Sequence, residues 1–279
     1  MCAMSTTDNN YVEYDRDLMR SCIYGLAIGD ALGVPYEFCE RGTFECTGMV
    51  GDGTHGQYAG TWSDDTSMAL CICSSIKRLG RIVTADIDDM FNRWLEDGDF
   101  TCDGHVFDVG VTCKKAISTG VPAKSYDYCG NGSLMRTAPL AMLNYFDVYK
   151  IRDVSAITHA HPVAEWSCVT LCDILWTIRK SGTPAKWVLW RRYGYIASRP
   201  VEAVKSDGYC EHTLEAALRC FLNTSSYADC VLAAVNLGGD TDTTAAVAGA
   251  LAGVYYRFEA IPPKWIGQLR GKAVIDQCI

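Results

Sequence analysis

Apolar residues recur at helical spacing along nearly the whole of this 279-residue chain. Between residues 15 and 31, for example, Leu18, Cys22 and Leu26 fall on one helix face. No convincing run of alternating β-branched residues accompanies this pattern. We therefore predict an all-α fold, a single compact bundle of roughly a dozen helices. Further helices are expected over 66–79, 84–95, 109–118, 134–143, 162–180, 214–222, 228–235 and 243–256, and a short one beginning at Ser155. A helix within 183–209 is expected to be short.

The chain shows no internal boundary. No Pro/Ser-rich linker and no repeat divide it, so residues 1–279 are expected to form one domain. The polar residues 1–13 are predicted to be a flexible tail and lack the basic and then apolar pattern of a signal peptide. No uninterrupted apolar run reaches the about 18 residues that a membrane span needs. A soluble, cytoplasmic monomer without a membrane partner is expected.

Charge and cysteine usage narrow the classes of protein. The net charge of −8 gives no broad attraction to nucleic acid or to anionic lipid, so no nucleic-acid partner is expected. Fifteen cysteines are present, an odd number, and none forms a C-x-x-C pair. This usage favours reduced thiols, with Cys168 and Cys172 as small core residues on one helix face, over a disulfide framework or a zinc site.

One predicted helix consists almost wholly of small residues, from Ala245 to Gly253. Small side chains allow neighbouring helices to approach closely, so this helix is expected to run through the centre of the bundle. Such a position would hold Asp240 and Asp242 rigidly at its N-terminus. Packing alone would also account for the composition, and the two interpretations are compatible.

Two short acidic segments carry the strongest chemical signal. The segments are Trp62–Thr66 and Gly238–Thr243, separated by more than half of the chain, and each contains two aspartates and hydroxyl side chains before a predicted helix. Aspartate is common as a helix cap, but capping uses one carboxylate per helix. Four carboxylates brought together by the fold would repel each other unless cations bound them. We therefore predict an oxygen-rich site for hard divalent cations such as Mg or Mn.

Further polar residues lie in loops. For Asp30, we slightly favour a carboxylate at a helix end that forms local hydrogen bonds. Glu37, after Pro35, is either an exposed loop residue or a general acid/base beside the cations. The run Gly130–Ser133 before a predicted helix would allow close backbone approach by an anion such as phosphate, although many such loops are only turns. Arg136 either adds a positive charge for that anion or has a structural role.

The segment Thr158–Pro162 contains two histidines, His159 and His161, two positions apart. No cysteine or acidic residue at suitable spacing supports a metal site there. A role in substrate contact or helix capping is therefore favoured.

Five blocks in this order resemble the ADP-ribosylglycohydrolase family, which includes the dinitrogenase reductase-activating glycohydrolases. The blocks are Gly25–Gly33, Trp62–Met68, Gly130–Arg136, Thr158–Pro162 and Asn236–Thr243, and they span most of the chain. The family is all-helical and binds two Mg or Mn ions. The resemblance implies the metal ligands Ser63, Asp64, Asp65, Asp240, Asp242 and Thr243. Ser63 replaces the usual threonine of the family and retains its hydroxyl.

The resemblance also implies the other site residues. It implies catalytic roles for Glu37, Asp65 and Asp242. Substrate binding falls on Gly130, Asn131, Gly132, Ser133, Met135, His159 and His161, with the glycine-rich loop at the diphosphate. The implied reaction is hydrolysis of the bond from C1″ of ADP-ribose to a side chain of a modified protein, through an oxocarbenium-like state.

Arginine is the leading linkage, and serine or another O-linked ADP-ribose is the alternative. The shape around Glu37 and the loop over 97–108 is expected to decide between them. A non-catalytic ADP-ribose-binding relative is an alternative of another class, against which the four retained aspartates argue.

Overall fold

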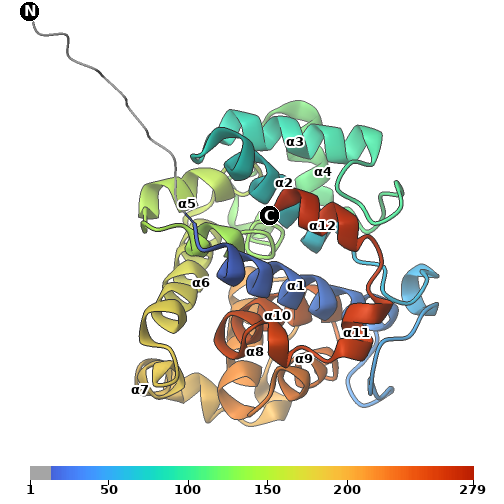
Figure 1. Cartoon of the computed structure of the whole chain (residues 1–279), viewed down its shortest axis with the longest axis vertical. Helices are drawn as coiled ribbons and strands as arrows, with labels where there is room; N and C mark the ends of the chain where they lie inside the picture. The colour runs from blue at the N-terminus through green and yellow to red at the C-terminus, as the bar shows by residue number, and fades with distance from the viewer. Residues whose placement is uncertain (1–13) are drawn as a thin grey trace, which may run out of the picture.

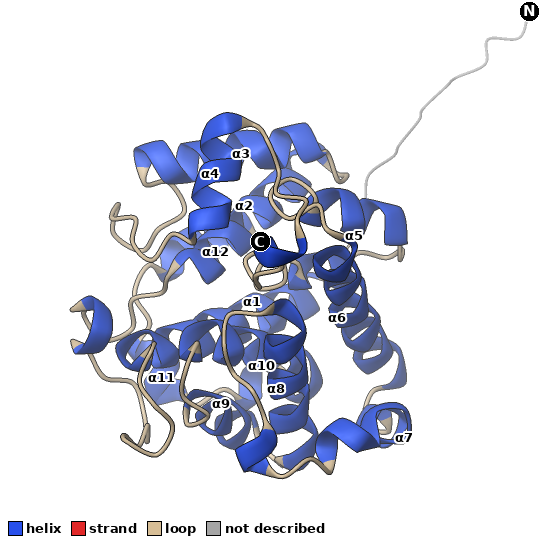
Figure 2. Cartoon of the chain, turned by 180° about the vertical axis from the view of Figure 1, so that it is seen from behind, coloured by secondary structure: helices blue, strands red, loops and turns tan. Residues whose placement is uncertain are grey.

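The computed structural model describes residues 14–279, and this part of the chain is helical without any strand beyond isolated bridges (Figures 1 and 2). The prediction of an all-α fold is confirmed, while the predicted tail over 1–13 lies outside the described residues. The helices are α1 Arg16–Gly33, α2 Asp64–Leu79, α3 Thr84–Asp97, α4 Val111–Thr119, α5 Val148–Ser155, α6 Pro162–Ser181, α7 Ala185–Ala197, α8 Cys210–Asn223, α9 Tyr227–Val235, α10 Thr241–Tyr256, α11 Pro263–Gln268 and α12 Lys272–Cys278.

Helices α1 and α10 pack side by side at the centre of the bundle (Figure 1). Their backbones touch, since a Cβ atom at Gly29 would lie 2.0 Å from the carbonyl oxygen of Ala245. A Cβ at Gly25 would likewise lie 2.3 Å from the carbonyl oxygen of Gly249. The small residues of α10 therefore permit the close contact and the central position that the sequence predicted.

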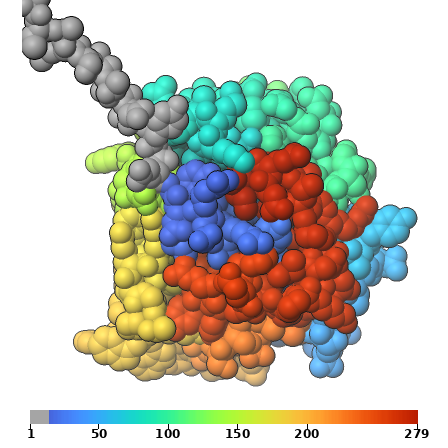
Figure 3. Space-filling view, viewed as in Figure 1, coloured from blue at the N-terminus to red at the C-terminus, as the bar shows by residue number. Residues whose placement is uncertain are grey.

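The remaining helices cover this central pair. Helices α8 and α9 pack on α10. Helix α2 packs on α1, and α3 packs on α2. Helix α6 contacts α5 as well as α7 and α8. In the space-filling view, α1 and the C-terminal segment lie together on one face (Figure 3). Among residues 14–279, no helix combines the length and apolar character that crossing a membrane would require.

Three expectations about local structure were wrong. The predicted helix over 134–143 is a series of turns followed by the 3-10 helix Ala138–Met142, because Pro139 lacks an N–H and its ring excludes a continuous α-helix. Ser155 ends helix α5 and does not begin one, and Asp147 caps that helix at its start. Within 183–209, α7 is 13 residues long, longer than the short helix expected there.

Candidate metal centre and active site

The C-terminal end of α1 joins the starts of α2 and α10. The carboxylate of Asp30 accepts hydrogen bonds from the backbone N–H of Ser63 at 2.9 Å and from that of Thr66 at 3.1 Å. Gly33 meets α10 so closely that a Cβ there would lie 2.3 Å from the Cα of Asp242. One turn of α1 thus brings the two acidic segments together. The interpretation of Asp30 as a locally bonded carboxylate was wrong, because its partners begin a different helix.

Asp65 is the point at which the two segments meet. Its Oδ2 accepts from the Ser63 hydroxyl at 3.1 Å and from the Thr243 hydroxyl at 3.3 Å, and its side chain is fully buried. Ser63 also caps α2, since its side chain accepts from the N–H of Asp65. The two hydroxyls predicted as ligands therefore converge on one carboxylate, which leaves Asp65 Oδ1 available.

Carboxylate oxygens of the two segments and of α1 form two overlapping groups. Oxygens of Asp30, Asp65 and Asp242 lie within 4.8 Å of one another, and so do oxygens of Glu37, Asp240 and Asp242. Asp242 belongs to both groups. The predicted convergence of the aspartates is therefore present, and Asp30 and Glu37 lie within it. Asp64 lies at the edge and lines the adjacent pocket.

The site contains carboxylate oxygens that the described residues leave without hydrogen bonds. Asp65 Oδ1, Asp240 Oδ1 and Asp242 Oδ2 are all buried and have no partner within 14–279. Asp240 stands at the N-cap position of α10, but its side chain makes no capping bond. Capping therefore does not explain the second acidic segment. Buried anionic oxygens without donors are suited to cations, so the residues present fit a divalent metal pair.

The electrostatics of the carboxylates agree with this fit. Burial is the largest cause that raises the pKa values of Asp64, Asp65 and Asp242 well above their ordinary range, and neighbouring carboxylates raise them further. The protein itself thus supplies little positive charge to this cluster. A bound cation would reverse both effects, because it favours the ionised form of each ligand.

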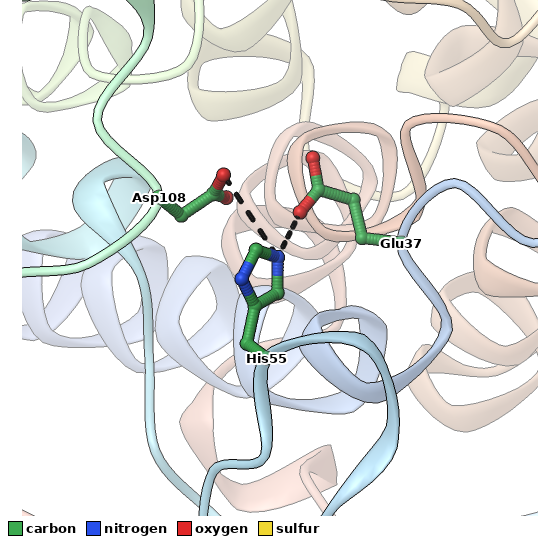
Figure 4. A group of neighbouring side chains, drawn as sticks. All are labelled: Glu37, His55 and Asp108. Carbon is green, nitrogen blue, oxygen red and sulfur yellow. Dashed lines mark hydrogen bonds and ion pairs between the residues drawn. The ribbon is translucent and has the colours of Figure 1, made fainter.

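Glu37 is buried and takes part in a second polar group (Figure 4). The Nε2 of His55 contacts a Glu37 carboxylate oxygen and lies 3.8 Å from Asp108 Oδ1. The chain turns sharply after Glu37, since Phe38 has a φ of 62° and is 71% exposed. The exposed-loop interpretation of Glu37 was wrong. Burial, followed by the charge of Asp240, raises the pKa of Glu37 to about 7.

His55 and Asp108 were missed in the sequence. Both stand in loops, and neither falls in a block of the family pattern used above. Asp108 ends the loop over 97–108 that was expected to influence the linkage, and its carboxylate faces Glu37 across His55 (Figure 4). The run of polar and aromatic residues around Asp108 gave a weak signal at most.

The glycine-rich loop borders the acidic cluster. Asn131 Nδ2 donates to Asp240 Oδ2 at 2.9 Å, which ties the loop to the second acidic segment. Gly130, Gly132, Met135 and His159 line the same pocket as Glu37, Asp64, Asp108, Asp240 and Thr243. The loop is followed by turns and not by a helix start, so the helix N–H groups expected there for an anion are absent from this part of the described chain.

Two residues of the predicted binding set face elsewhere. The side chain of Ser133 is buried and accepts from the Ser155 hydroxyl at 2.9 Å. His161 caps helix α6, with Nδ1 accepting from the N–H of Val163 at 3.2 Å.

Arg136 is buried in the core beneath the loop and packs on Phe91, with its guanidinium 4.6 Å from the ring centre. Its charge therefore does not reach the pocket surface.

A second pocket adjoins the first at Gly130. It is lined by aromatic and polar side chains that include Tyr126, Lys205, Tyr209 and His212. The hydroxyls of Tyr126 and Tyr209 lie 3.0 Å apart, and their ring centres are 6.0 Å apart. Gly130 lines both pockets, so these aromatic side chains lie next to the pocket that contains the carboxylates.

Comparison with known proteins places this chain in a family. The family model described as ADP-ribosylglycohydrolase matches residues 12–279. The chain is 31% identical to "ADP-ribosylarginine hydrolase Tri1" of Serratia proteamaculans (strain 568), over 91% of this chain and 75% of that protein. It is 30% identical to "ADP-ribosyl-[dinitrogen reductase] glycohydrolase" of Rhodospirillum rubrum, over 92% of this chain and 90% of that protein.

A solved structure agrees with the sequence comparison. The structure titled "ADP-ribosylglycohydrolase-related protein complex" superposes with a TM-score of 0.78 at 31% identity, and covers 94% of this chain and 96% of that chain. The match thus extends over the helices that bring the acidic segments together. The chain belongs to the ADP-ribosylglycohydrolase family of enzymes.

Proposed function

We propose that this protein removes ADP-ribose from modified arginine side chains of proteins, with two divalent cations, Mg or Mn, at the acidic cluster. The single observation that carries the cation part is the set of buried oxygens of Asp65, Asp240 and Asp242 that lack hydrogen bonds. Support for arginine comes from a relative that is 31% identical, the ADP-ribosylarginine hydrolase of Serratia proteamaculans.

The proposed ligands are the hydroxyl and carboxylate side chains of the two segments. They are Ser63, Asp64, Asp65, Asp240, Asp242 and Thr243. When bound, the two cations would supply the positive charge that the site itself lacks. Asp30 is assigned a supporting role, because its oxygens accept hydrogen bonds from the start of α2.

Glu37 is proposed as the general acid/base. Hydrolysis forms a bond from a water oxygen to C1″ and breaks the bond from C1″ to the arginine nitrogen, and one water proton ends on that nitrogen. Glu37 is buried beside Asp240 and Asp242, so it can accept the proton and pass it to the leaving group. The Glu37–His55 contact fixes the carboxylate in the pocket. Asp65 and Asp242 would contribute by holding the cations beside Glu37, and the cations would supply positive charge there.

The substrate is proposed to lie across the two adjoining pockets. Gly130, Asn131, Gly132 and Met135 would border the diphosphate, and the Tyr126–Tyr209 surface is suited to stacking by the adenine ring. The rest of the modified protein would then extend from the pocket into solvent beside Phe38. This residue follows Glu37 and is 71% exposed. Binding of the remote diphosphate would orient the reacting sugar.

The test is hydrolysis of two defined substrates by the full chain. Arginine-ADP-ribosylated and serine-ADP-ribosylated peptides are incubated with enzyme stripped by EDTA, with and without added Mn, and free ADP-ribose is measured by mass spectrometry. We expect release from the arginine peptide only when Mn is present. Release of ADP-ribose from the serine peptide alone would overturn the proposed arginine linkage. Equal release with and without Mn after EDTA treatment would overturn the proposed role of the cations.

A further inference from the structure

Arg136 is a buried cation without an anionic partner. Its side chain is 0% exposed, and no carboxylate of residues 14–279 contacts it. Nη1 donates to the carbonyl oxygen of Gly132 at 3.0 Å, and Nη2 donates to the Thr158 hydroxyl oxygen at 2.8 Å. A charge is costly to bury without a counter-charge, so its position beneath the glycine-rich loop calls for a specific explanation.

Thr158 transmits the effect of Arg136 to His159. The Thr158 hydroxyl oxygen lies 2.7 Å from Nδ1 of His159, and both residues are buried. A guanidinium has no acceptor atom, so Thr158 must accept the hydrogen bond from Arg136. Two neighbours can accept the proton of this hydroxyl, Nδ1 of His159 and the thiol sulfur of Cys113. A thiol sulfur is a weak acceptor, so Nδ1 is the favoured one. A hydrogen on Nδ1 would leave the buried hydroxyl proton with the weak sulfur acceptor alone.

The assignment of Nδ1 as an acceptor places the ring hydrogen on Nε2. His159 lines the pocket that contains Glu37, Asp64 and Asp240. Its Nε2 faces the glycine-rich loop, since a Cβ at Gly130 or at Gly132 would lie 3.6 Å from it. No residue in the described part of the chain accepts a hydrogen bond from Nε2. The pocket therefore contains one fixed donor that has no protein partner.

We propose that Arg136 and Thr158 are positioning residues that hold His159 as its Nε2–H tautomer, and that this N–H donates to an acceptor oxygen of the ADP-ribosyl group. The second half of this statement rests on the proposed function, because it requires ADP-ribose in the pocket. The first half concerns the free protein alone. Burial, and then the charge of Arg136, lower the pKa of His159 to about 3, which supports a ring that stays neutral while it donates.

The tautomer is measured directly by nuclear magnetic resonance. The full chain is labelled with ¹⁵N-histidine, and the five histidines are separated by loss of one ring signal in His159→Asn. At neutral pH we expect Nδ1 of His159 in the range of an unprotonated nitrogen and Nε2 in the range of a protonated one. A protonated Nδ1 would overturn the positioning role, whether or not the protein binds ADP-ribose.

Addition of ADP-ribose tests the second half. We expect a downfield shift of the Nε2–H proton on binding, as a new hydrogen bond forms. Binding without a change at Nε2–H would contradict the contact. If ADP-ribose fails to bind at all, the proposed function fails, and the proposed contact with it, while the spectrum of the free protein still decides the role of Arg136 and Thr158.

A pair of substitutions at Thr158 separates positioning from simple packing. Thr158→Val keeps the shape and removes the hydroxyl, while Thr158→Ser keeps the hydroxyl. We expect Thr158→Val to mix the two tautomers and to raise the Kd for ADP-ribose about three- to tenfold, as for loss of one neutral hydrogen bond. Thr158→Ser should behave as the wild type. Equal loss in both variants would show a packing role, and if Thr158→Val does not fold, the wild-type spectrum decides.

Discussion

The hydroxyl of Thr243 donates to Asp65 Oδ2 at 3.3 Å, although 178 residues separate the two positions. Ser63 donates to the same oxygen at 3.1 Å. Each helix start thus contributes a hydroxyl to one buried carboxylate, and Asp65 Oδ1 has no partner among the described residues. This relationship turns two separate helix N-termini into one site. The central packing of α1 against α10 holds it in place.

Substitution of Asp65 should separate activity from stability. Asp65→Asn removes one charge from a cluster in which carboxylates raise the pKa values of one another. We expect turnover to fall at least about 100-fold. The melting temperature of the EDTA-treated protein should rise by about 2–4 °C for each 1 kcal/mol of relieved repulsion. Calorimetry with and without Mn measures the melting temperature, and Mn should stabilise the wild type and not the variant. Turnover is measured by release of ADP-ribose.

The matched control for Asp65 is Asp153→Asn, at a carboxylate whose side chain is 56% exposed. It should leave the melting temperature, the response to Mn and the turnover unchanged. If Asp65→Asn retains turnover and its response to Mn, the proposed ligand role is wrong.

Glu37 should matter for turnover more than for cation binding. Glu37→Gln keeps the size of a buried side chain and removes its capacity to accept a proton. We expect kcat to fall about 10²–10⁴-fold while the number of bound Mn ions stays the same. Steady-state kinetics and Mn titration give the two values. Glu40→Gln, at an exposed position three residues further on, is the control and should change neither kcat nor the number of bound Mn ions. A variant at Glu37 with normal kcat would exclude the acid/base role.

The contact between the two central helices should be intolerant of a single methyl group. A Cβ at Gly29 would lie 2.0 Å from the carbonyl oxygen of Ala245, and backbone cannot move aside as a flexible side chain can. We expect Gly29→Ala to lower the free energy of unfolding by about 3 kcal/mol or more. Urea denaturation followed by circular dichroism is the measurement.

The control for Gly29 lies in helix α11. Gly267 is exposed, and a Cβ there would have no neighbour within 4 Å. Gly267→Ala should be neutral or stabilise by up to about 1 kcal/mol, through reduced freedom of the unfolded chain. Similar destabilisation at both positions would mean that the close approach of α1 and α10 is not the cause.

The glycine-rich loop offers a second matched pair. A Cβ at Gly132 would meet Cys113 Sγ at 2.7 Å and His159 Cε1 at 3.1 Å, whereas the nearest atom at Gly130 would be 3.6 Å away. Gly132→Ala should therefore displace the His159 ring and weaken ADP-ribose binding by about tenfold or more, the equivalent of about 1.4 kcal/mol. Gly130→Ala should weaken it less. Isothermal titration with ADP-ribose compares them, and the reverse order would contradict the described orientation of His159.

Much of the fold followed from local pattern. The apolar spacing located α1, α2, α3, α6 and α10 within a few residues, because each is long and amphipathic or uniformly small. The helix expected over 134–143 was wrong although the sequence contains Pro139, whose effect on the backbone should have outweighed the apolar spacing. The short helices α11 and α12 carry few turns of periodic pattern, and they were missed.

The site was predictable where chemistry is concentrated in sequence. The paired aspartates of the two segments stood out because capping does not require two carboxylates. By contrast, Asp30, His55 and Asp108 are single residues in separate elements, and only the fold places them beside Asp65 and Glu37. Arg136 was left open between a charge for the substrate and a structural role, and its burial became visible only in three dimensions.

The most direct test of the shared site is anomalous diffraction from crystals of the full chain grown with Mn. The account predicts two Mn peaks, both within coordination distance of oxygens from the two acidic segments, with Asp65 and Asp242 among the ligands of the pair. A crystal saturated with Mn that shows no peak between Asp65 and Asp242 would contradict it.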